Sequence, residues 1–182
     1  LLPPTERDLL QKAAVVGETF WDGALRALGA ETPEVPLVYL CTREFLRLQP
    51  TSRFSGFREY AFRHALVRDV AYSMTPGARR REMHAAIAAW IESRETGSIE
   101  DDVLAARHFE AAGASNAAAR AYIRAGRRAS KHYNAFEEAR RYLQAALGLA
   151  EALGDDVVRR DAMGHIGQVY ARNAQHTEAE QY

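Results

Sequence analysis

Apolar and polar positions follow helical spacing over most of the chain. The first apolar run predicts a helix that Thr5 caps and Gly17 ends. A short second helix is expected over 22–28, where Gly29 stops it. The pattern therefore predicts a mainly α fold from the start of the chain.

The next stretch predicts a third helix and then a hairpin. Between Pro36 and Pro50 the apolar residues share one helical face: Val38, Cys41, Phe45 and Leu48. The residues 51–62 predict a small β-hairpin whose turn lies near Ser55 and Gly56. Three helices followed by a hairpin is the element order of a winged helix, so we expect a winged-helix domain over 1–75.

The segment 60–72 joins a short strand to a helix. Tyr60 and Phe62 alternate with other residues as in a strand. Apolar residues then fall at helical spacing: Leu66, Val67, Val70, Ala71 and Met74. His64 lies at the junction, where it either caps the helix, fills a polar gap, or donates hydrogen bonds to a group outside its own domain.

Helical spacing continues through a long connecting helix, expected over 76–97. One face of it is apolar: Met83, Ala86, Ile87, Trp90 and Ile91. It begins with three arginines, Arg79 to Arg81, which form a solvated face or steer an anionic partner.

Residues 98–182 predict an array of tetratricopeptide-like helical repeats. Ser98 and Asp101 resemble a capping box, opening a helix that runs to Gly113. A first-helix pattern then occurs twice, about 40 residues apart, and a second-helix pattern lies between the copies. These patterns are Tyr122, Ala125, Gly126, Ala129; then Ala139, Leu143, Ala146, Ala150, Leu153; then Met163, Ile166, Gly167, Tyr170, followed by Ala179. Such arrays form superhelices, and the second repeat is expected to be cut short.

The string R-H-A-L-V-R-D-V-A around His64 resembles the M-H-D-L-V-R-D-L-A stretch that closes the winged-helix domain of STAND signalling NTPases. In that family the histidine contacts the β-phosphate of ADP and holds the inactive state. The resemblance implies this role for His64. Ala65 departs from the motif, because the family's aspartate is missing.

A longer stretch is similar to bacterial STAND ATPases found beside adenylate cyclase, kinase or LuxR-type output domains. It includes His108, Phe109 and Tyr122. The resemblance implies an upstream nucleotide-binding domain in cis that binds ADP or ATP with Mg, whereas the chain itself holds no cofactor. It also implies that the repeats dock a protein, a peptide or a small effector. The chain starts without methionine and stops inside a helical pattern, so we expect a piece of a larger signalling protein.

Charge and composition narrow the choice of partners. Lys and Arg number 24, as do Asp and Glu, so a non-specific polyanion binder is disfavoured. We expect no DNA reading by the third helix and wing, because Glu44 offsets Arg43 and Arg47 there. The lone Cys41 suits a structural thiol in a cytoplasmic protein, and no apolar run is long enough for a membrane span.

Catalytic motifs are missing from the sequence. It contains no phosphate-binding loop, no H-E-x-x-H zinc motif and no G-x-S-x-G elbow, so we expect no enzyme activity and no metal site in this chain. Two functions remain. Either the chain is the switch-and-sensor part of a STAND ATPase, or it is a stand-alone helical scaffold that binds proteins without a nucleotide.

Overall fold

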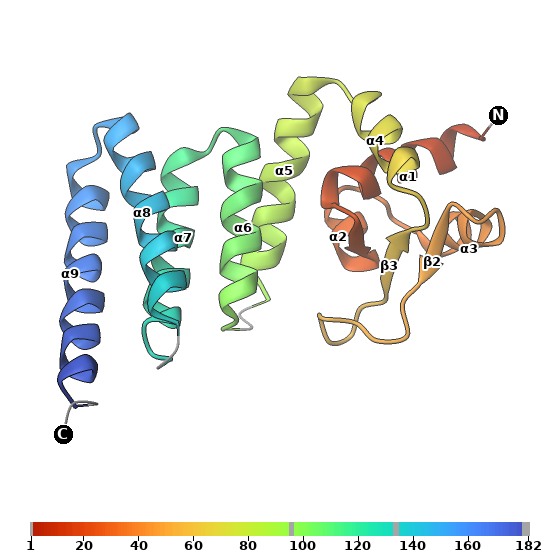
Figure 1. Cartoon of the computed structure of the whole chain (residues 1–182). Coiled ribbons are helices and arrows are strands. Elements are labelled where there is room, and N and C mark those ends of the chain that lie inside the picture. The colour runs from red at the N-terminus through yellow and green to blue at the C-terminus, as the bar shows by residue number, and fades with distance from the viewer. Residues whose placement is uncertain (1, 95–96, 133–134, 180–182) are drawn as a thin grey trace. The chain divides into compact units, whose positions relative to one another are not determined.

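The computed structural model describes residues 2–94, 97–132 and 135–179, with side chains up to residue 174. The chain is mainly helical and carries a small antiparallel sheet of three strands (Figure 1). Its contacts divide it into two compact units: unit 1 is Leu1–Trp90 and unit 2 is Ile91–Tyr182. The predicted class, mainly α with a small β element, is confirmed.

Unit 1 contains all three strands. Its elements are α1 (Pro4–Val16), β1 (Thr19–Trp21), α2 (Asp22–Ala27), α3 (Glu34–Thr42), β2 (Leu46–Leu48), β3 (Glu59–Phe62), α4 (Ala65–Ser73) and most of α5 (Gly77–Glu92). Gly17 ends α1 as predicted, but the predicted cap at Thr5 is wrong. Pro3 occupies the N-cap position and Pro4 the first turn, where a proline loses no helical hydrogen bond.

The predicted third helix and hairpin are wrong in their boundaries. Helix α3 ends at Thr42, and Glu44 then adopts a left-handed conformation with φ of 60°. The amide of Phe45 donates to the carbonyl of Leu40, which turns the chain out of the helix. Leu46–Leu48 therefore forms a strand, and the residues between Leu48 and Glu59 form its long connection to β3 rather than a hairpin arm.

Strand β3 lies at the centre of the sheet, in the order β1-β3-β2. Phe20 pairs with Tyr60 on one side, and Leu46 pairs with Phe62 on the other. The indole nitrogen of Trp21 donates to the Glu59 carboxylate at 2.9 Å. This sheet fixes the strand end that leads directly into His64 and α4.

Helix α5 packs on the rest of unit 1 through the predicted apolar face, of which Met83, Ile87 and Trp90 are buried. The Trp90 ring contacts those of Trp21 and Phe54, with centroids 6.0 and 5.0 Å away. Its basic start is held in place as well. Arg79 donates to Asp8 at 2.6 Å, and the guanidinium of Arg80 lies 4.7 Å from the centroid of the Tyr72 ring.

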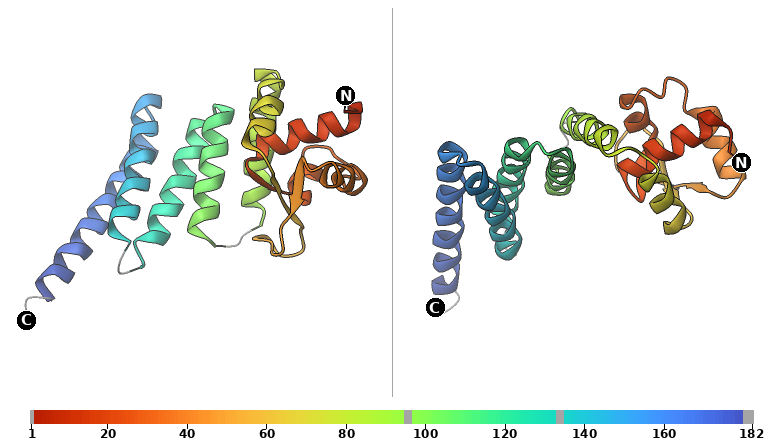
Figure 2. Two further views of the ribbon diagram at one scale, coloured as in Figure 1. Left: turned by 45° about the vertical axis from the view of Figure 1, so that its right-hand side comes forward. Right: turned by 90° about the horizontal axis from the view of Figure 1, so that it is seen from above.

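Unit 2 consists of antiparallel neighbouring helices, α6 (Ile99–Ala112), α7 (Ser115–Ala129), α8 (Phe136–Leu153) and α9 (Asp156–Ala179) (Figure 2). The predicted cap of α6 is confirmed, because the Ser98 hydroxyl accepts from the amide of Asp101. Gly113 and Gly154 end α6 and α8 in the left-handed conformation that glycine adopts without strain.

Small residues allow α7 and α8 to approach closely. A Cβ added at Gly126 would lie 2.5 Å from Cγ of Leu143, so a larger residue there would force Leu143 to shift. Of the predicted α8 positions, Ala139, Leu143, Ala146 and Ala150 are fully buried, whereas Leu153 is half exposed. In α9, the predicted positions that correspond to those of α7 are uncovered among the described residues. Met163 and Tyr170 are half exposed, and nothing lies within 4 Å of a Cβ at Gly167. Ala179 ends α9, and its side chain lies outside the described residues.

Candidate functional site

His64 occupies the N-cap position of α4, directly after β3. Its backbone is extended, with φ of −134° and ψ of 125°, and its side chain makes no capping hydrogen bond. The residue is exposed, so it fills no polar gap. The structure therefore shows the His64 side chain neither capping α4 nor filling a polar gap. Its ring is free to meet a group outside unit 1.

The helix that follows His64 carries an uncovered apolar face. Leu66 is 73% exposed, Val70 49% and Met74 55%, whereas Ala71 is buried. Together with Leu10 of α1, these residues line a shallow cavity of about 320 Å³ that is almost entirely apolar. Exposed apolar residues gathered on one helix face are typical of a contact surface. We call this surface, from Leu66 through Val70 to Met74, the α4 face.

Charged residues next to His64 and along α4 form exposed ion pairs. Arg68 lies 3.4 Å from both Glu18 and Asp69, and Arg63 lies 3.8 Å from Glu44. Exposed pairs of this kind contribute at most about 1 kcal/mol each and exchange partners readily. A polyanion that reached His64 could therefore recruit these arginines at small cost.

Other candidate chemistry is limited in the described residues. Cys41 is half-buried, and burial raises the pKa of its thiol, which keeps it protonated as expected for a structural cysteine. Within the part of the chain that the structure describes, no group of three or more histidine, cysteine, aspartate or glutamate residues could hold a metal ion. None of the described helices is long and apolar enough to cross a bilayer.

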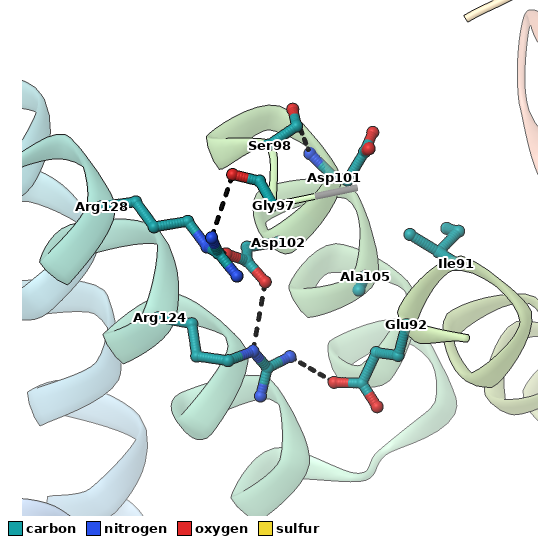
Figure 3. A pocket seen from close by; sticks show the side chains of 9 residues that line it. All are labelled: Ile91, Glu92, Gly97, Ser98, Asp101, Asp102, Ala105, Arg124 and Arg128. Atoms are coloured by element: carbon teal, nitrogen blue, oxygen red, sulfur yellow. Dashed lines mark hydrogen bonds and ion pairs between the residues drawn. The ribbon is translucent and has the colours of Figure 1, made fainter. Parts of the chain in front are cut away.

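A polar pocket of about 470 Å³ lies beside α6 and α7 in unit 2 (Figure 3). Arg124 is bonded to Glu92 and, at 3.1 Å, to Asp102. Arg128 bonds the other oxygen of Asp102 at 2.6 Å and the carbonyl of Gly97 at 3.0 Å. Because each guanidinium already has acceptors, the residues of this pocket form an ion-pair network that joins Glu92, α6 and α7 within unit 2.

Sequence reasoning missed a second cavity in unit 2, which basic side chains of α7 and α9 surround. The signal was present, because Arg124, Arg127, Arg128 and Lys131 recur at the spacing of one helix face. The facing residues of α9, among them Arg172, could not be assigned to the same cavity without the packing of the helices.

Comparison of the chain with protein families, with curated proteins and with solved structures found no match.

Proposed function

We propose that the chain is the regulatory part of a nucleotide-switched STAND-type signalling ATPase. In this proposal unit 1 is a winged helix that holds the ADP-bound off state through His64, and unit 2 docks an effector or a partner protein. The chain itself performs no catalysis. The observation that carries the proposal is the exposed His64 at the start of α4, next to an apolar face that no described residue of unit 1 covers.

The order of elements in unit 1 supports the winged-helix assignment. A strand after the first helix, two further helices, and two strands joined by a long connection follow one another as in that fold. The first strand of the sheet pairs with the third, which closes the three helices into one core. The α4 face then remains as a surface for an upstream nucleotide-binding domain.

The helices of unit 2 support a repeat array. Gly126 and the alanines of α8 give the close helix approach that stacked repeats require. The spacing of the α7 pattern returns in α9, where Gly167 and Tyr170 stand at the corresponding positions. A repeat array offers an extended surface to a partner, which is the role proposed for unit 2.

A histidine that donates to a diphosphate can bias a two-state switch. Hydrogen bonds to charged groups contribute about 1.5–3 kcal/mol. A preference of that size shifts a closed-to-open equilibrium by about tenfold to a hundredfold. The exposed ring of His64 can make such a bond only when another domain brings the phosphate to it.

The test uses the protein that joins a nucleotide-binding domain to unit 1. His64→Ala should speed ADP dissociation by about tenfold or more and raise basal output. Arg141→Ala, at an exposed residue of α8 that lines neither of the basic cavities of unit 2, is the control and should change neither. An ADP dissociation rate that His64→Ala leaves unchanged would remove His64 from the mechanism.

A stand-alone scaffold that binds proteins is the second candidate. It is favoured by the half-exposed residues of α9 and the basic cavity of unit 2, neither of which needs a nucleotide. It predicts no ADP binding by any form of the protein, so the same measurement separates the two functions.

A further inference from the structure

Cations gather around one cavity of unit 2. Arg124, Arg127 and Arg128 come from α7, Lys131 follows its end, and Arg172 comes from α9. His165 of α9 also lines the cavity, and its Nε2 lies 3.4 Å from the Asp161 carboxylate. The cavity holds about 390 Å³, and no carboxylate is among the described residues that line it. The chain has no net charge, so this is a local excess.

Some of these cations are already paired. Asp102 bonds both Arg124 and Arg128, and Arg172 donates to the carbonyl of Ser130 at 3.0 Å. Arg127 and Lys131 differ, because neither has an ion-pair partner among the residues that the structure describes. Arg127 lies in the last turn of α7 and Lys131 just beyond its end, and both line the same cavity, where like charges repel. An anion at this place would relieve that repulsion.

A neighbouring cavity of about 340 Å³ shares Lys131 and Arg172 with the first one. It adds Phe136 and Val169, so an apolar surface lies directly beside the cations. The Phe136 ring is fixed by an edge-to-face contact with Tyr170, with centroids 5.4 Å apart. A ligand that fits both cavities carries negative charge next to an aromatic or aliphatic group.

The helix end that faces the site disfavours a compact phosphate. The C-terminus of α7 lies here, and its carbonyls give this end partial negative charge. Phosphate sites use the opposite end of a helix, where amides point at the anion. Carboxylates spread along a peptide can reach Arg127 and Lys131 individually without crowding charge against these carbonyls.

We propose that the two neighbouring cavities of unit 2 bind an acidic peptide segment, in which carboxylates flank an aromatic or aliphatic residue. The carboxylates pair with Arg127 and Lys131, and the apolar side chain packs on Phe136 and Val169. This inference deepens the docking role proposed for unit 2. It does not depend on the nucleotide switch, so either can fail alone.

The test measures binding of the fluorescein-labelled peptide Glu-Glu-Phe-Glu-Glu to the chain by fluorescence anisotropy. The double variant Arg127→Gln and Lys131→Gln should weaken binding by about tenfold or more, since it removes two charge-assisted hydrogen bonds. The control Arg141→Gln and Arg160→Gln removes the same charge from residues outside both cavities and should change the affinity by less than about twofold.

Two further probes decide between peptide recognition and simple charge attraction. Replacing the glutamates of the probe with glutamine should abolish binding, and replacing its phenylalanine with glycine should weaken it. Equal losses in the two double variants would overturn the proposal, as would equal binding of the glutamine peptide. Tighter binding of single-stranded oligothymidylate through the same two residues would instead assign the cavity to nucleic acid.

Discussion

His84 is a buried histidine of unit 1, and its surroundings differ from those of exposed His64. Its Nε2 lies 3.3 Å from the Tyr72 hydroxyl. Burial is the main cause that lowers the pKa of His84, and the positive charge of Arg80 adds to it. The folded chain therefore favours the neutral ring.

The lowered pKa of His84 predicts how stability depends on pH. In the unfolded chain a histidine titrates near about pH 6.5. Below that pH the unfolded state binds a proton that the folded state refuses, so the free energy of unfolding falls as the pH drops toward the folded pKa. Urea unfolding between about pH 7.5 and about pH 5.5 measures this loss. His84→Gln should reduce the dependence of the free energy of unfolding on pH, whereas His132→Gln at an exposed position should not. An equal dependence in the parent chain and both variants would show that His84 is not its source.

At the scale of elements, local signals predicted most helices. The stops at Gly17, Gly29 and Gly113 and the Ser98 cap are residue choices that act within a few positions, and the structure confirms them. Leu46–Leu48 could not be assigned in this way. Its apolar residues fit a helix face as well as a strand, and the pairing of Leu46 with Phe62 is a contact between distant parts of the chain.

The candidate sites show the same division. His64 was found from the sequence because a short motif surrounds it, but its exposed ring and the uncovered α4 face required the packing of unit 1. The basic stripe of α7 was visible in the spacing of Arg124 and Arg127. That Arg172 of α9 lines the same cavity depends on how the helices pack, which spacing alone does not determine.

Two glycines of unit 2 give a matched test of how its helices pack. Gly126→Ala places a methyl against Leu143 and the carbonyl of Ala139, and we expect a loss of about 1–3 kcal/mol in the free energy of unfolding. Gly148→Ala in the interior of α8 meets nothing within 4 Å, so we expect a gain of about 0.5–1 kcal/mol from its better helix propensity. Urea titrations of both variants measure the difference.

The Gly126 effect should depend on its neighbour. In a Leu143→Ala background the added methyl has room, so Gly126→Ala should cost clearly less there than in the parent chain. An unchanged cost would mean that Gly126 is needed for a reason other than the close approach of α7 and α8.

For the whole molecule, the balance of basic and acidic residues bears on whether the chain binds DNA. The basic residues near the third helix of unit 1 have local partners: Arg43 donates to the Tyr39 hydroxyl, and Arg63 lies 3.8 Å from Glu44. Tight binding to a phosphate backbone needs an unbalanced basic surface. We therefore predict that unit 1 does not bind duplex DNA tightly at physiological salt. A gel shift showing a submicromolar, sequence-dependent Kd would contradict this prediction.

In the proposed switch, another domain covers His64 and the α4 face in the ADP state, and the oxidation of methionines can report this cover. Met74 on that face is 55% exposed, Met163 in unit 2 is 51% exposed, and Met83 in the core is 6% exposed. Accessible thioethers are oxidised to sulfoxides, and mass spectrometry resolves each site. In the chain alone, Met74 and Met163 should oxidise quickly and Met83 slowly.

The decisive measurement repeats this oxidation on the protein that includes a nucleotide-binding domain, first with ADP and then with ATP. We predict that ADP slows oxidation of Met74 but not of Met163, and that ATP restores the oxidation of Met74. Oxidation of Met74 at the rate of the isolated chain in both nucleotide states would contradict the proposed switch. The α4 face would then be no part of a nucleotide switch, and the scaffold function would remain.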